Sequence, residues 1–213
     1  MPLCDPLDRV LIFINEEGLR MLDAADLGAA VTALTDALEP GIDRDWTVSA
    51  LNSEWSCWKA AEHICDVLFS YAGQLAAAAP SAYVKLWLKA DEKAGPADLI
   101  EGIRATTGIL ESVVRNTATD VRGYHPSGIA DAEGFAAMGV AELLLHGYDI
   151  VAGLGLEFRP PDELCGKVLT RIFPTVDSGP DQWLTLRWAT GRAEFPGRAA
   201  VTEWEWKPAP RSE

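Results

Sequence analysis

Apolar side chains recur at intervals of three and four residues along much of the chain, which is the period of a helix with one buried face. The first such stretch covers residues 6–38, with a break near Gly18, and Glu39-Pro40-Gly41 ends it. A second stretch begins at Ser56, whose hydroxyl suits a helix cap, and continues to the alanines before Pro80. These patterns predict two long helices joined by a linker.

Two further long helices follow from the same pattern. Gly95-Pro96 begins the third, and its apolar positions keep helical spacing to about Asn116. The fourth takes in residues 135–151 and closes at Gly153. The chain therefore carries four long helical patterns, separated by connections of moderate length.

The remaining segments are shorter. Residues 83–88 alternate in a way that predicts a short extended segment. Pro160-Pro161-Asp162 precedes a fifth helix over residues 163–173, and tryptophan-rich pieces follow it. We predict an all-α fold: an antiparallel four-helix bundle over residues 1–175, with a small C-terminal extension, residues 176–213, packing on it.

The charge balance narrows the choice of partners. The formal net charge is −14, with no run of lysine or arginine, and this disfavours nucleic acid and anionic membrane surfaces. No apolar stretch approaches the roughly 20 residues that cross a bilayer, and the first residues lack the features of a secretory signal. We therefore expect a cytoplasmic protein whose four cysteines, which show no CxxC spacing, stay reduced.

Histidines are scarce, and two of the three lie among apolar helical positions. Glu142 and His146 are four residues apart on the fourth predicted helix, so both side chains project from one face. Three leucines separate them, and a carboxylate or an imidazole in apolar surroundings needs a partner. Two interpretations stand: an ion pair on a solvated face, or two ligands of one metal ion.

His63, on the second predicted helix, is open to the same choice between a hydrogen-bonded core histidine and a metal ligand. Facing helices of a bundle can bring such a histidine and an i, i+4 pair together. We predict that His63, Glu142 and His146 hold one divalent metal ion. Three nitrogen and oxygen ligands leave a coordination position open, as in catalytic rather than structural sites.

Two aspartates are placed to support these ligands. Asp66 follows His63 by three residues, and Asp149 follows His146 by three. Either carboxylate could orient a ligand imidazole through its second ring nitrogen. The alternative for both is an ordinary solvated carboxylate.

Three more residues are candidates for the lining of a pocket. His125 lies in a loop beside Pro126, Trp55 precedes the second helix, and Arg192 lies in the C-terminal extension. A role for the His125 loop in starting the fourth helix explains that segment as well. Tryptophans at such spacings are more often ordinary core residues.

Two segments carry a family resemblance. Trp55-Ser56-Cys57-Trp58-Lys59-Ala60-Ala61-Glu62-His63 and Val140-Ala141-Glu142-Leu143-Leu144-Leu145-His146-Gly147-Tyr148-Asp149 resemble the DinB-like superfamily, in particular the mycothiol-dependent maleylpyruvate isomerase group of actinobacteria. Trp188-Ala189-Thr190-Gly191-Arg192 extends the likeness into the tail. The resemblance implies a four-helix bundle with a divalent metal, usually zinc, on the residues matching His63, Glu142 and His146.

The resemblance also implies a function. It suggests a metal-dependent enzyme that uses a low-molecular-weight thiol, mycothiol, for isomerisation or S-transfer on a small electrophilic substrate, and a homodimer is compatible with it. The isomerase itself has a larger C-terminal domain that contributes an arginine, whereas Arg187, Arg192 and Arg198 lie here in a shorter tail. Two alternatives stand beside it: a non-catalytic metal-dependent binding or stress-response protein, and a metal-assisted hydrolase that activates water.

Overall fold

The computed structural model describes residues 22–211, which form an all-α structure without a β-strand. Its elements are α1 (Ala24–Leu38), the 3-10 turn η2 (Glu39–Gly41), α2 (Cys57–Ala77), α3 (Pro96–Asn116), α4 (Ala132–Gly153), α5 (Asp162–Ile172) and α6 (Gln182–Ala189). The predicted all-α class is therefore confirmed.

Local capping explains where the helices begin. The Ser56 hydroxyl accepts a hydrogen bond from the backbone N–H of Lys59 at the start of α2, as the sequence predicts. Asp131 caps α4 in the same way through the N–H of Gly134. α1 begins at Ala24 because Asp23 forms a capping box there, and the part of the first predicted helix over residues 6–21 lies outside the described residues.

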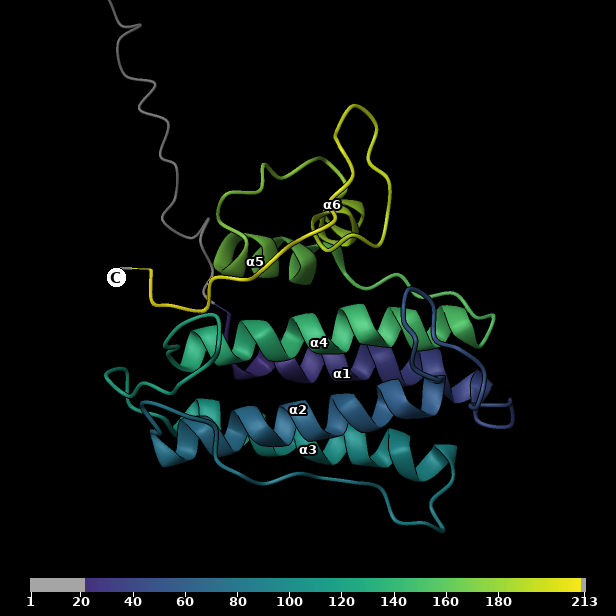
Figure 1. Cartoon of the computed structure of the whole chain (residues 1–213), viewed down its shortest axis with the longest axis horizontal. Helices are drawn as coiled ribbons and strands as arrows, with labels where there is room; N and C mark the ends of the chain where they lie inside the picture. The colour runs from purple at the N-terminus through teal and green to yellow at the C-terminus, as the bar shows by residue number, and fades with distance from the viewer. Residues whose placement is uncertain (1–21, 212–213) are drawn as a thin grey trace, which may run out of the picture.

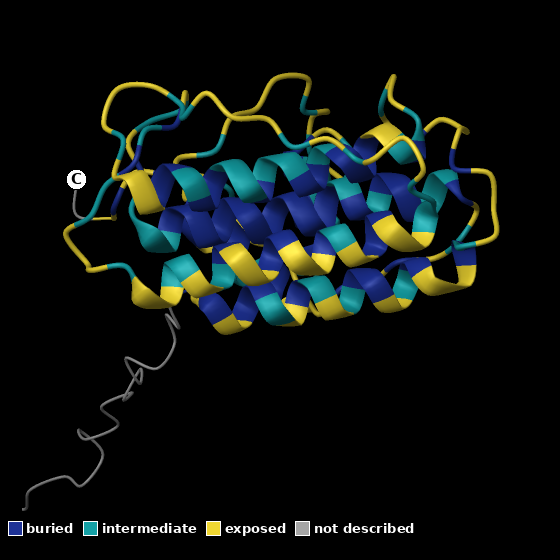
Figure 2. Ribbon diagram, turned by 90° about the horizontal axis from the view of Figure 1, so that it is seen from below, coloured by how far each residue is buried: buried dark blue, intermediate teal, exposed yellow. Residues whose placement is uncertain are grey.

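The four long helices α1 to α4 lie side by side, as Figure 1 shows, with α2 and α1 each packed against both α3 and α4. Figure 2 shows buried residues on the faces between the helices and exposed residues along the outer faces. This division is what an apolar stripe at helical spacing produces.

The helix directions differ from the predicted antiparallel arrangement. Gly102 near the start of α3 lies against the Cys65 sulfur in the first half of α2, and Leu75 at the end of α2 lines one cavity with Val113 near the end of α3, so these helices run parallel. α1 and α4 run parallel as well, since Gly139 and Gly147 lie against Leu27 and Leu34 in the same order. The cause is the connection over residues 78–95, which crosses the length of the helices before α3 begins (Figure 1). α2 with α4, and α1 with α3, are antiparallel neighbours.

The predicted extended segment, residues 83–88, lies within this crossover and forms no strand. Its backbone is held by α2 side chains instead of by a β partner. The fully buried amide of Gln74 accepts a hydrogen bond from the N–H of Val84 and donates to the carbonyls of Ala82 and Tyr124. Hydrogen bonds to the buried Gln74 side chain therefore hold this segment, in place of the β-strand pairing that the alternating pattern suggested.

The C-terminal part packs on the α4 side of the molecule, through α5 and α6 (Figure 1). The sequence pattern missed α6: the tryptophan-rich piece that begins at Trp183 is a helix, capped by Asp181. Near the C-terminus, the buried Arg171 of α5 donates to Asp131 and to the carbonyl of Pro208, which ties the end of the chain to the start of α4.

α4 is the central element of the fold. Every residue from Gly134 to Leu145 is buried. Among the described residues it is the single helix with the length and hydropathy of a membrane span, yet 83% of the apolar window is buried inside the protein, which is the environment of a core helix.

Candidate metal centre

Three side chains converge between α2 and α4. Because these helices are antiparallel neighbours, His63 on α2 faces Glu142 and His146 on α4. One potential ligand atom from each lies within 4.8 Å of the others. The structure therefore brings together the three residues predicted as metal ligands.

Glu142 is the centre of this group and is 5% exposed. Its Oε1 accepts a hydrogen bond of 3.1 Å from the hydroxyl of Tyr71. Its Oε2 is buried without a hydrogen-bond partner among the described residues, and it lies 3.5 Å from Nε2 of His63 and 3.3 Å from Nε2 of His146. A buried carboxylate oxygen without a partner is costly, and a cation between these three atoms would remove that cost. The donor set fits a divalent metal ion.

The protonation states suit metal binding. Burial raises the pKa of Glu142. Its interactions with His63, His146 and Tyr71 together lower the pKa by more than burial raises it, so the pKa of Glu142 lies below its ordinary value. Burial lowers the pKa of His146 despite the nearby Glu142 charge. A carboxylate beside a neutral imidazole is the state that a metal ligand must have.

His146 is supported on its other side by an aspartate and an arginine. Its Nδ1 lies 3.6 Å from Oδ2 of Asp149, whose side chain is 1% exposed. Arg192 donates to both carboxylate oxygens of Asp149, at 2.9 to 3.2 Å, and Asn52 donates to Oδ1 at 3.3 Å. Gly191, with a φ of 71°, turns the chain after α6 so that Arg192 reaches this position. Asp149 therefore lies close to His146, but Nδ1 of His146 has no hydrogen-bond partner among the described residues, so the orienting role of Asp149 stays a prediction.

Trp55 covers the histidines from the solvent side. Its ring centroid lies 4.8 Å from that of His63 and 5.9 Å from that of His146, and the residue is 38% exposed. Trp55 is therefore a partly exposed residue beside the two imidazoles and not a core residue, and its role in lining a pocket stays a prediction.

Asp66 serves a different segment. Its Oδ1 accepts a hydrogen bond of 2.7 Å from the backbone N–H of Leu88, in the crossover. Among the described residues its carboxylate forms no hydrogen bond with His63, so the predicted orienting role has no contact to support it.

His125 and Tyr71 lie behind Glu142. The buried His125 ring contacts Tyr71, Tyr83 and Trp206, and its Nδ1 accepts a hydrogen bond from the N–H of Ser127. His125 is not one of the converging ligand atoms. Tyr71, which binds Glu142 directly, was not predicted as a site residue, although its position eight residues after His63 on an apolar helix face was a signal.

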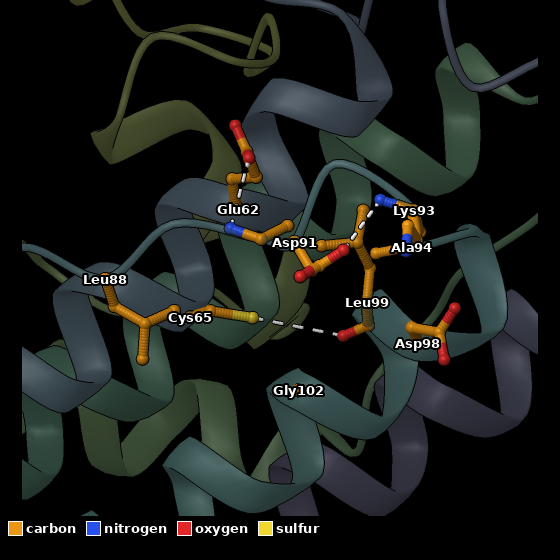
Figure 3. A pocket seen from close by; sticks show the side chains of 10 residues that line it. Glu62, Cys65, Leu88, Asp91, Lys93, Ala94, Asp98, Leu99 and Gly102 are labelled. Carbon is orange, nitrogen blue, oxygen red and sulfur yellow. Dashed lines mark hydrogen bonds between the residues drawn. The ribbon is translucent and has the colours of Figure 1, made fainter.

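A separate cavity of about 380 Å³ lies between α2, the end of the crossover and the start of α3 (Figure 3). Its three carboxylates accept hydrogen bonds from backbone N–H groups. The carboxylate of Glu62 accepts a hydrogen bond from the N–H of Ala90, and that of Asp91 accepts one from the N–H of Lys93. The carboxylate of Asp98 accepts one from the N–H of Gly95. The thiol of Cys65 there has its pKa raised by burial to about 12, so it is not a thiolate at neutral pH. This cavity has no unsatisfied group comparable to Glu142 Oε2.

Comparisons of the chain with protein-family models, with curated proteins and with solved structures found no match. The chemistry of the candidate site therefore has to be argued from its own residues.

Proposed function

We propose that this protein is a DinB-like four-helix bundle that holds a divalent metal, zinc in the first instance, at His63, Glu142 and His146. We further propose that it uses a low-molecular-weight thiol, mycothiol, for isomerisation or S-transfer on a small electrophilic substrate. One observation carries the metal assignment: the buried Oε2 of Glu142 has no hydrogen-bond partner among the described residues and faces both histidine Nε2 atoms.

The donor set supports a catalytic role for the metal over a structural one. Zinc commonly takes four ligands, and two imidazoles with one carboxylate supply three. A metal bound there would favour the deprotonated form of a thiol or a water at the fourth position. Structural zinc sites, by contrast, are closed by four protein ligands.

The chain's own residues prepare the centre in three ways. Tyr71 donates to Oε1 of Glu142 and leaves Oε2 directed at the histidines. Asp149, held by Arg192, places a carboxylate oxygen 3.6 Å from Nδ1 of His146, on the side of the ring away from Nε2, which faces Glu142. Trp55 lies over both imidazoles and limits the access of water.

The burial of the three cysteine thiols in the described part of the chain supports an external thiol. Burial raises the pKa of Cys57 to about 11 and the pKa values of Cys65 and Cys165 to about 12. These cysteines are therefore neutral thiols at physiological pH. A thiolate nucleophile at this centre would come from a small molecule, and a cytoplasmic setting would supply one.

The test is turnover by the zinc-loaded protein. A panel of small electrophiles, including cis-configured unsaturated diacids, is assayed with mycothiol, without thiol, and with mycothiol plus the Glu142→Ala variant. The proposal expects turnover that requires both mycothiol and Glu142. Turnover by the wild type without thiol would replace it with a metal-assisted hydrolase. Tight binding of panel members without turnover would replace it with a non-catalytic binding protein.

A further inference from the structure

A second cavity, of about 300 Å³, adjoins the candidate metal centre. It lies between α2 and the crossover segment, and His63 forms part of its wall. Its volume is at the lower end of the range for small-molecule sites. Because His63 belongs both to the cavity wall and to the converging ligand group, a molecule in the cavity lies next to the metal position.

Tyr83 connects the cavity to the centre from the other side. It lines the cavity and packs edge-on against His125, whose ring in turn contacts the Tyr71 that donates to Glu142. The charge of Glu142 contributes to a raised pKa for Tyr83, after the larger effect of burial, so its hydroxyl stays protonated and available as a hydrogen-bond donor. A ligand in the cavity thus has His63 and a neutral phenol as polar neighbours.

The rest of the wall has few charges to offer a ligand. Val67 and Val84 are half-buried apolar residues, and the Asp66 carboxylate already accepts from the N–H of Leu88. Lys85 is the single cation of the wall, and it lies in an exposed position. This wall favours an uncharged apolar body over an anion.

The outer rim of the cavity is unusually apolar for a surface. Leu86 is 60% exposed and Trp87 is 81% exposed, and they are adjacent in the chain. Both are the most exposed large apolar side chains of the described residues. A ligand whose apolar part leaves the cavity against these side chains would remove their surface from water.

From these contacts we infer that the cavity formed by α2 and residues 83–87 binds the uncharged, apolar part of the small molecule that acts at the metal, and that this segment sets its selectivity. The inference rests on the proposed function, because it takes the centre to hold a metal. It adds the class of substrate: a neutral molecule with an aromatic or branched hydrocarbon body next to its reacting group, and not a small dianion.

Two probes with the same metal-binding head group test this inference. Acetohydroxamate reports the metal centre alone, and benzohydroxamate adds an uncharged phenyl ring. Binding to the zinc-loaded protein is measured by titration calorimetry, with bound zinc measured before and after. We expect benzohydroxamate to bind at least about tenfold more tightly. A third probe, 4-carboxybenzohydroxamate, carries an added negative charge and should lose most of that gain.

Variants place the ring in this cavity. Ser70→Trp fills the cavity from α2 and should abolish the preference for benzohydroxamate while acetohydroxamate binds as before. Ser112→Trp, the same substitution at an exposed position on α3, is the matched control and should keep the preference. The double variant Leu86→Ala with Trp87→Ala removes exposed side chains that do not support the core, so it should fold and reduce the preference.

The possible outcomes separate the two claims. Equal affinity of both probes for the wild type, or an unchanged preference in Ser70→Trp and in the double variant, would overturn the cavity assignment and leave the metal centre standing. Failure of both probes to bind the zinc-loaded protein would overturn the metal centre and this inference with it.

Discussion

Arg192 acts on the candidate centre through Asp149, because it donates to both carboxylate oxygens of Asp149 and not to a ligand side chain. Arg192→Ala should therefore weaken zinc binding by about 10- to 100-fold, the usual cost of losing a group that orients a ligand. Competition with a chromophoric chelator gives the dissociation constants. Arg198→Ala, in the same tail but stacked on Trp188 and Phe195, is the control and should bind zinc as the wild type does. Equal affinities in both variants would remove Arg192 from the account.

Tyr71 is the partner that keeps Glu142 satisfied on one side. Tyr71→Phe removes the donor to a buried carboxylate oxygen, so the metal-free protein should lose about 1–3 kcal/mol of unfolding free energy. Denaturant titration measures the loss. In a Glu142→Ala background the same substitution should cost clearly less, because the unsatisfied oxygen is gone. An equal cost in both backgrounds would show that Tyr71 contributes through packing alone.

At this scale the sequence predicted residues better than it predicted their partners. His63, Glu142 and His146 stood out because histidine and glutamate are rare among apolar helical positions. The Tyr71 contact and the double donation by Arg192 depend on which helix faces which and on the turn at Gly191. The spacing of residues within one segment does not show which helices face each other or where the chain turns after α6.

At the scale of elements, Gly153 at the end of α4 is packed against the linker before α2. A Cβ there would lie 2.6 Å from the carbonyl oxygen of Ser49 and 2.9 Å from Cα of Ala50, so the linker backbone would have to move. Gly153→Ala should destabilise the protein by about 1–3 kcal/mol. Gly73→Ala, on α2 with nothing within 4 Å of its added Cβ, is the matched control and should be neutral or stabilising by up to about 1 kcal/mol. Similar melting temperatures for the two variants would contradict this packing.

The helix bounds were predictable where caps and periodicity agree. Ser56, the Gly95-Pro96 pair and Pro174 mark helix ends within a residue or two of those in the structure. The helix directions were not predictable, because the pattern does not show that residues 78–95 cross the molecule. α6 was missed because it is short and its tryptophans resemble a tail that packs by side chains alone.

At the scale of the whole molecule, the unfolding free energy should decrease as the pH falls below about 6.5. Burial lowers the pKa of His125 from 6.5, so below pH 6.5 the unfolded chain binds a proton that the folded protein does not. The stability contribution is complete above pH 6.5 and is lost as the pH falls toward the lower folded-state pKa. The unfolding free energy of the metal-free protein should decrease with a slope of at most about 1.4 kcal/mol per pH unit from this group.

The variant His125→Gln isolates that contribution. Its unfolding free energy, measured in denaturant with a chelator present, should depend less steeply on pH below 6.5 than that of the wild type. His146, whose pKa is also lowered by burial, retains its own part of the slope in both proteins. Identical slopes in the two proteins would contradict the assignment to His125.

The net charge of the whole molecule affects which ions and ligands approach the candidate centre. With a formal charge of −14, the molecule is expected to attract cations, which favours the loading of a metal centre and disfavours anionic substrates. A neutral, apolar substrate class, argued above from the cavity wall, is consistent with the same field.

The most direct test of the account is the metal content of the purified protein after dialysis against zinc. Elemental analysis should find one zinc per chain in the wild type and in His125→Gln, the variant of the remaining histidine, and little in His63→Ala and Glu142→Ala. Full zinc occupancy in both ligand variants, with all four proteins folded by circular dichroism, would contradict the central claim that His63, Glu142 and His146 form a metal centre.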